Sequence, residues 1–257
     1  MRSETACHAD ERLPDPEGTG GAFITLEGID GCGKSTQTRL LTCALELAGY
    51  DVLQLREPGG TRISEKIRGL LLDPENGEMG DVCELLLYEA ARAQLVHERI
   101  APAISEGRVV VCDRFYDSTT CYQAFAGGVD RAAVDRANEL AVGACRPDLT
   151  LVFDLDPAVA AARTGDRVAD RMEAKGLEYQ QRVAAGFRAI AAEEPGRVRL
   201  VDAAEGVEDV LGQVVRAVSE LGLDISAVVP EVLRAEGAAD AQVPASSGGG
   251  SHPGGAS

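Results

Sequence analysis

The chain has 257 residues, of which 25 are basic and 42 acidic, giving a formal net charge of −17. This length suits one sizeable domain with tails, and the negative charge disfavours nucleic acid or an anionic membrane as a partner held by a broad basic surface. The seven cysteines form no Cys-x-x-Cys pair, and no apolar run reaches the roughly 20 residues of a membrane helix. We therefore expect a cytoplasmic protein with no disulfide framework, zinc site or membrane span.

The chain begins with a segment that suits a flexible leader. Residues 1–20 are mostly polar, contain Pro14 and Pro16, and end in Gly-Thr-Gly-Gly. Segments of this composition rarely pack into a core. We therefore start the folded domain at residue 21 and extend it to residue 224.

The first predicted strand is followed by a glycine-rich loop. Residues 22–26 predict a buried strand, and apolar residues at helical spacing predict a helix over 34–48. Between them, GIDGCGKST matches the phosphate-binding pattern GxxxxGK[ST]. Glycines let backbone N–H groups turn toward phosphates, Lys34 offers a charge to the β and γ groups, and Ser35 offers a hydroxyl to magnesium. A degenerate loop that binds nothing is the alternative. The predicted triphosphate site consists of Gly28, Ile29, Asp30, Gly31, Cys32, Gly33, Lys34, Ser35 and Thr36.

Short apolar runs and longer helical patterns alternate after this loop. Further strands are predicted at 52–55, 109–112, 149–155 and 198–201. Helices are predicted at 61–72, 82–106, 130–142, 157–163, 178–193 and 207–222. This alternation is typical of an α/β fold with three layers, in which a five-stranded parallel sheet is covered by helices on both faces. Ligands of such sheets bind outside the carboxyl ends of the strands.

Charged residues follow the predicted strands at that edge. Arg56 and Glu57 come after the second strand, and Asp113 and Arg114 come after the third. Asp113 is placed to order magnesium through water, although capping of the next turn would also explain it. Arg114 is interpreted as a clamp for an anion, with a surface ion pair as the alternative.

Residues 163–176 are interpreted as a small lid. Arg163, Arg167 and Arg171 recur every four residues and would share one helical face. Taken alone, this spacing is better explained by pairing with the interleaved acidic residues on a solvated helix. Gly165 and Gly176, however, flank the segment with flexible points, as a lid over a transferring phosphate requires.

The chain ends in a segment rich in Ala, Gly, Ser and Pro. Such a composition buries too little apolar area to offset its ordering entropy. We predict a disordered tail over 225–257, with a weak helix over 227–236 as the alternative.

Six sequence blocks together resemble bacterial thymidylate kinase, a family of P-loop nucleoside monophosphate kinases. They occur in the family's order across residues 22–222. The blocks are EGIDGCGKSTQ (27–37), REPGGT (56–61), LYEAARAQ (87–94), DRFYDSTTCYQ (113–123), PDLTL (147–151) and DRME (170–173). The resemblance implies the P-loop NTPase fold, transfer of the γ-phosphate of ATP to dTMP with Mg²⁺, formation of dTDP on the route to dTTP for DNA synthesis, and a homodimer.

The resemblance also implies roles for individual residues. Lys34, Arg114 and Arg171 take the catalytic positions, and Ser35 and Asp113 the metal positions. Tyr88 stands where the family usually stacks a phenylalanine on thymine, and Tyr122 where a side chain crowds a ribose 2′-hydroxyl. The implied dTMP site consists of Asp30, Arg56, Glu57, Arg68, Tyr88, Arg92, Arg114, Thr119, Tyr122 and Gln123.

The loop residue Gly31 indicates which of the family's two arrangements this chain resembles. The catalytic arginine of the family lies either in the phosphate loop or on the lid, and here the loop position is a glycine. The charge is then expected from the lid, from Arg171 first and from Arg167 or Arg163 second. Two other functions stay open at this point: a P-loop kinase of another small acceptor, and a nucleotide-binding module without turnover. The absence of an N-K-x-D motif after the loop speaks against the module.

Overall fold

The computed structural model describes residues 21–165 and 171–241. Its sheet has five strands, all parallel, in the order β2-β3-β1-β4-β5. The strands are β1 (Phe23–Glu27), β2 (Val52–Arg56), β3 (Val109–Asp113), β4 (Leu149–Asp154) and β5 (Val198–Asp202). Each lies within two residues of the prediction at either end, so the expected α/β fold with a five-stranded parallel sheet is confirmed.

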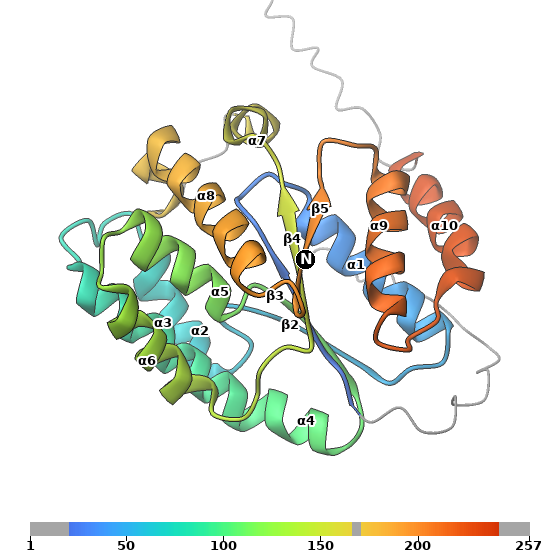
Figure 1. Ribbon diagram of the computed structural model, residues 1–257, viewed down its shortest axis with the longest axis horizontal. Coiled ribbons are helices and arrows are strands. Elements are labelled where there is room, and N and C mark those ends of the chain that lie inside the picture. The colour runs from blue at the N-terminus through green and yellow to red at the C-terminus, as the bar shows by residue number, and fades with distance from the viewer. Residues whose placement is uncertain (1–20, 166–170, 242–257) are drawn as a thin grey trace, which may run out of the picture.

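Helices cover both faces of the sheet (Figure 1). They are α1 (Lys34–Leu47), α2 (Arg62–Leu72), α3 (Asp81–Leu95), α4 (Ala101–Ser105), α5 (Tyr116–Thr119), α6 (Arg131–Val142), α7 (Pro157–Thr164), α8 (Leu177–Glu193), α9 (Val207–Ser219) and α10 (Val229–Ala241). A π-helical segment, Val96–Ile100, joins α3 to α4, so the chain is helical over nearly all of the predicted range 82–106.

Side chains alternate along the strands, so the hydrophobic core is divided between the two faces of the sheet. Ile24 and Leu26 of β1 belong to the cluster that includes α1. Phe23 of the same strand packs instead with residues of α3 and α4, such as Leu95 and Ala103. Successive side chains of a strand point to opposite faces, and all five residues of β1 are buried. The strand is therefore central, which holds the loop that follows it against a rigid sheet.

The structure contains a helical stretch that the sequence analysis did not predict. Helix α5 continues directly into a π-helical segment, Thr120–Ala126. Paired β-branched threonines and aromatic residues give this stretch a low intrinsic helix propensity. It is held by packing, since Phe115, Cys121 and Tyr122 are buried in the two clusters.

The C-terminal part of the chain differs from the predicted disordered tail. Residues 229–241 form α10, which lies beside α1 and α9 in Figure 1. Val232 is 1% exposed in the cluster that includes α1, and Arg39 pairs with Glu236. The prediction of disorder from residue 225 is thus wrong over α10, because a few apolar residues find a docking face that composition alone does not reveal. Residues 1–20 and 242–257 lie outside the described residues.

None of the helices in the described ranges is both long and apolar enough to cross a membrane.

Candidate active site

A cavity of about 520 Å³ opens at the carboxyl ends of the strands. It is lined by the loops after β1, β2 and β3 and by parts of α2, α3, α5 and α7. The predicted site residues that line it are Asp30, Gly31, Gly33, Lys34, Ser35, Thr36, Arg56, Glu57, Arg68, Tyr88, Arg92, Asp113, Arg114, Thr119, Tyr122 and Gln123. The predicted residues that do not line it are Gly28, Ile29, Cys32 and Arg171. The structure thus brings most of the predicted site residues together in one cavity.

The phosphate loop after β1 is shaped by glycines. Gly28, Gly31 and Gly33 have φ values of 135°, 80° and 94°, which side chains other than glycine rarely adopt. The Lys34 ammonium lies 2.9 Å from both Gly28 O and Ile29 O, so the loop's own carbonyls hold it. Lys34 is the first residue of α1, whose N-terminal N–H groups favour an anion at this point.

The position of Gly31 leaves no room for a side chain. A Cβ atom built there would lie 2.5 Å from Ala160 O and 3.0 Å from Thr164 Cγ2, both on α7. An arginine at this loop position would therefore require α7 to move. The packing of α7 gives a physical reason for seeking the catalytic arginine elsewhere.

A hydroxyl and a carboxylate meet next to this loop. Ser35 Oγ donates to Asp113 Oδ2 across 3.4 Å, and Asp113 Oδ1 is buried without a hydrogen-bond partner. The described residues contain no cluster of three or more His, Cys, Asp and Glu side chains that would hold a metal by itself. The oxygen donors fit a magnesium ion that takes its remaining ligands from phosphates and water.

Arg114 occupies a strained position between the phosphate loop and α5. It is the one non-glycine residue with a positive φ, 71°, in the described part of the chain, which costs about 1 to 2 kcal/mol. Its guanidinium lies 2.7 Å from Asp30 Oδ1 and donates to Gly28 O and Ser118 Oγ. The guanidinium also lies over the ring of Tyr122, 5.2 Å from its centroid. Such strain recurs at functional sites, where it fixes a side chain in one place.

Two further arginines converge beyond β2. Arg56 Nη1 and Arg68 Nη1 both donate to Pro58 O, at 3.0 and 2.8 Å. Arg56 also pairs with Glu65 through its other nitrogen, at 3.1 Å. Together with Arg114 these side chains make one region of an otherwise acidic molecule suitable for a phosphate monoester.

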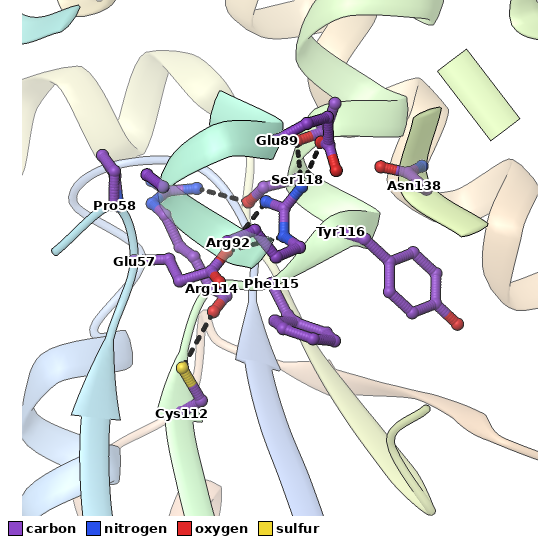
Figure 2. A network of polar contacts seen from close by, with 12 residues as sticks. Glu57, Pro58, Glu89, Arg92, Cys112, Arg114, Phe115, Tyr116, Ser118 and Asn138 are labelled. Atoms are coloured by element: carbon purple, nitrogen blue, oxygen red, sulfur yellow. Dashed lines mark hydrogen bonds and ion pairs between the residues drawn. The ribbon is translucent and has the colours of Figure 1, made fainter. Parts of the chain in front are cut away.

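Arg92 lies fully buried between two carboxylates (Figure 2). The guanidinium is 2.8 Å from Glu57 Oε2, it pairs with Glu89, and it donates to Thr119 Oγ1 at 3.0 Å. Burial, together with the charge of nearby Glu89, raises the pKa of Glu57 to about 8, although Arg92 opposes the shift. The two carboxylates outweigh burial at Arg92 and hold its pKa above the usual value, so the side chain stays cationic.

Gln123 comes from the π-helical segment that the sequence did not predict. It is 2% exposed, lines the cavity and donates from Nε2 to Glu84 Oε1 at 2.8 Å. Glu84 and Glu89 were missed as site residues. Glu89 precedes Arg92 by three residues on α3, a helical pair that the spacing could have suggested. Glu84 meets Gln123 of the Thr120–Ala126 segment only in the folded structure.

The three candidate lid arginines have different surroundings. Arg163 lines the cavity and donates to Ala203 O at 3.2 Å. Arg171 is 8% exposed, donates to Leu71 O and pairs with Glu84. Arg167 lies outside the described residues. The role of Arg171 as a catalytic group stays a prediction, since in this structure its guanidinium contacts protein atoms rather than the cavity.

Comparisons with known proteins agree on one family. The sequence profile of the thymidylate kinase family matches residues 26–214. A thymidylate kinase of Symbiobacterium thermophilum is 48% identical over 199 residues, covering 77% of this chain and 93% of the relative. One of Geobacter sulfurreducens is 48% identical over 195 residues, covering 73% and 92%. The crystal structure of thymidylate kinase from Ehrlichia chaffeensis aligns with a TM-score of 0.64 at 32% identity, covering 78% of this chain and 99% of that one.

Proposed function

The chain belongs to the thymidylate kinase family, and on that premise we propose how its residues carry out the reaction. The enzyme phosphorylates dTMP to dTDP with ATP as the phosphoryl donor, a step toward dTTP. The observation that carries the assignment of roles is a single cavity in which a phosphate loop, an arginine cluster and a buried polar pocket all meet. No feature favours another acceptor or a module without turnover.

We assign the triphosphate to the loop Gly28–Thr36. The loop glycines leave their N–H groups free of side-chain crowding, and the N-terminus of α1 adds its dipole. Lys34 would exchange the carbonyls of Gly28 and Ile29 for the β and γ phosphates. Because those carbonyls already hold the ammonium at the loop, little reorganisation is needed when ATP binds.

Ser35 and Asp113 are the residues that would hold Mg²⁺. Their support is the contact between the Ser35 hydroxyl and the Asp113 carboxylate, together with the buried, unpartnered Asp113 Oδ1. When bound, the ion neutralises charge on the β and γ phosphate oxygens. Asp113 is fixed at the end of β3, paired in register with Leu26 of β1, so its distance to the phosphate loop is set by the sheet.

We assign dTMP to the other side of the cavity. Arg56, Arg68 and Arg114 would bind its phosphate, with Glu57 nearby and Asp30 next to the sugar 3′-hydroxyl. Tyr88 would stack on the base, and Tyr122 would crowd a 2′-hydroxyl. The base edge would meet Arg92, Thr119 and Gln123. Support comes from the convergence of Arg56 and Arg68 on one carbonyl and from the burial of Arg92 and Gln123.

The transfer step then depends on position and charge. The acceptor phosphate, held by Arg114, and the γ-phosphate, held by Lys34, meet in one cavity, and phosphoryl transfer needs little else from a protein. Arg171 is retained as the catalytic arginine on the lid. This role requires its guanidinium to leave Glu84 for the transferring phosphate when both nucleotides are bound.

We further propose a homodimer formed through α2 and α3. These helices pack against each other and expose four large apolar side chains, Ile63 and Leu70 on α2 and Val82 and Leu86 on α3. Adjacent exposed apolar residues mark interaction surfaces in soluble proteins.

We also propose a cytoplasmic location and no nucleic-acid partner. Six free cysteines in the described residues suit a reducing cytoplasm, and the charge of −17 disfavours nucleic acid as a partner.

A steady-state assay tests the proposed function. ATP-dependent phosphorylation is measured with dTMP, dUMP, CMP and AMP as acceptors, and dTMP is expected to give the highest kcat/KM. A rate with dTMP no higher than that with CMP or AMP would overturn the assignment.

A further inference from the structure

One buried carboxylate joins three segments that are far apart in the sequence. Glu84, in the first turn of α3, is 2% exposed. Its oxygens receive Gln123 Nε2 at 2.8 Å, Lys175 Nζ at 3.2 Å and Arg171 Nη1 at 2.5 Å. Lys175 contacts both carboxylate oxygens. Burying a carboxylate is costly unless its partners compensate for the lost hydration. Three donors gather around this one, so the arrangement calls for an explanation.

The charge state of Glu84 follows from these neighbours. Burial alone would raise the pKa of Glu84, but the hydrogen bond from Gln123 and the charges of Lys175 and Arg171 together bring it below the usual value. An ionised carboxylate has acceptor sites and no donor. Gln123 can therefore offer it only the NH₂ end of its amide.

This constraint fixes the orientation of the Gln123 amide. The nitrogen and oxygen of a carboxamide point in different directions from the same carbon, so binding of the nitrogen by Glu84 turns the oxygen to another side. Gln123 lines the nucleotide cavity. Its oxygen is then the group available to a bound base, and it can accept a hydrogen bond but cannot donate one.

We propose that Glu84 is a positioning residue for base selection, which holds Gln123 with its amide oxygen toward the base. This inference rests on the proposed function. Thymine presents an N3–H donor to such an acceptor, whereas cytosine presents a bare N3 acceptor. Arg92, a donor only, lines the same part of the cavity and matches the thymine O4, where cytosine carries an NH₂ donor. Two fixed mismatches against cytosine give the site its selectivity.

Glu84 thereby connects base recognition with residues 171–175. When Arg171 moves to the phosphates, Lys175 keeps the Glu84 carboxylate in an ion pair, because it contacts both carboxylate oxygens. A purely structural role, in which Glu84 only ties these residues to α3, would affect dTMP and dCMP equally. Selectivity is therefore the quantity to measure.

The first experiment measures kcat/KM for dTMP and dCMP with Glu84→Gln. A glutamine at this site can donate or accept, so both orientations of Gln123 become available. We expect the dTMP to dCMP ratio to fall by about tenfold or more. The matched control is Glu220→Gln, an exposed acid paired with Arg199 at 2.8 Å, which should leave the ratio unchanged. An unchanged ratio in Glu84→Gln overturns the inference, while failure of the wild type to use dTMP would overturn the proposed function instead.

The second experiment tests whether the effect passes through Gln123. In a Gln123→Ala background, Glu84→Gln should no longer change the ratio, because the amide that it orients is absent. An equal loss of selectivity in both backgrounds contradicts the inference. If Glu84→Gln does not fold, Glu84→Asp replaces it, because aspartate keeps the charge but holds it one methylene farther from Gln123. The same fall in the dTMP to dCMP ratio is expected, and an unchanged ratio counts against the proposal.

Discussion

The phosphate loop holds its lysine with its own backbone, whereas the base end of the cavity holds Arg92 and Gln123 with side chains, most of them from distant segments of the chain. Glu89, which is on the same helix as Arg92, is the exception. Lys34 contacts carbonyls five and six residues away. Gln123 depends on Glu84, 39 residues away, and Arg92 depends on Glu57, 35 residues away. Recognition of the triphosphate is thus a local property of the chain, and recognition of the base is a property of tertiary packing.

The difference suits the two tasks. A triphosphate needs several N–H groups and one cation, which a single turn at a helix N-terminus supplies. Distinguishing one base from another needs donors and acceptors held in fixed directions, and a flexible side chain gives such direction only when buried partners hold it. Substitutions at the two ends should therefore have different kinetic signatures.

The largest effect is expected from Lys34→Ala. This change removes the buried charge that would contact the β and γ phosphates, and kcat should fall by about a thousandfold. Steady-state kinetics at saturating dTMP measure it. Arg216→Ala, on the exposed side of α9 and away from the cavity, is the control and should retain activity. A Lys34→Ala enzyme with a kcat close to the wild type would show that the loop does not act on the transferring phosphate.

The next effect in size concerns Arg171→Ala. If its contacts with phosphate form mainly in the transition state, kcat should fall by about a hundredfold while the affinity for ATP hardly changes. Steady-state kinetics give kcat, and calorimetry with ATP gives the affinity. A kcat equal to that of the wild type would show that Arg171 is not a catalytic residue. Arg163, which lines the cavity, would then be the next candidate.

A smaller effect is expected from Tyr88→Ala at the base end. Loss of a stacking partner costs about 1 to 3 kcal/mol per base, so the KM for dTMP should rise by about tenfold or more while the KM for ATP stays the same. Initial rates over both substrates measure the two constants. Equal rises in both would mean that Tyr88 supports the cavity rather than the base.

The smallest effect is a change in how stability depends on pH. The raised pKa of Glu57, about 8, means that the folded state binds this proton more tightly than the unfolded state does. Stability is therefore lost as pH rises from about 4.5 toward 8. Glu57→Gln should reduce that slope, by at most about 1.4 kcal/mol per pH unit. Urea unfolding of both proteins at pH 5.5 and 8 measures it, and parallel slopes would show that Glu57 is ionised throughout this range.

The same contrast explains what the sequence could predict. The five strands and the phosphate loop follow from short-range pattern, because each buried run and each glycine acts within its own segment. The residues of the base end, such as Tyr88, Arg92 and Gln123, were instead implied by the family resemblance. The helix over 116–126 was missed because Thr119 and Thr120 have low helix propensity and are held by packing. Glu84 was missed because nothing near it in the sequence identifies Gln123, 39 residues away, as its partner. Glu89 precedes Arg92 by three residues on one helix, so the spacing could have suggested that pair.

Helix α10 was given only as an alternative, a weak helix over 227–236, for a related reason. Its residues resemble a solvated tail in composition, and only the groove beside α1 makes Val232 a core residue. The predicted lid, in contrast, stays a prediction, because residues 166–170 lie outside the described part of the chain.

All the roles assigned above require two nucleotides to bind side by side in one cavity of an acidic protein. Calorimetric titration of dTMP into enzyme saturated with Mg²⁺ and a non-hydrolysable ATP analogue tests it most directly. We expect dTMP to bind with a stoichiometry of about one per chain while the analogue stays bound. Displacement of the analogue by dTMP, or no binding of dTMP to the saturated enzyme, would contradict it.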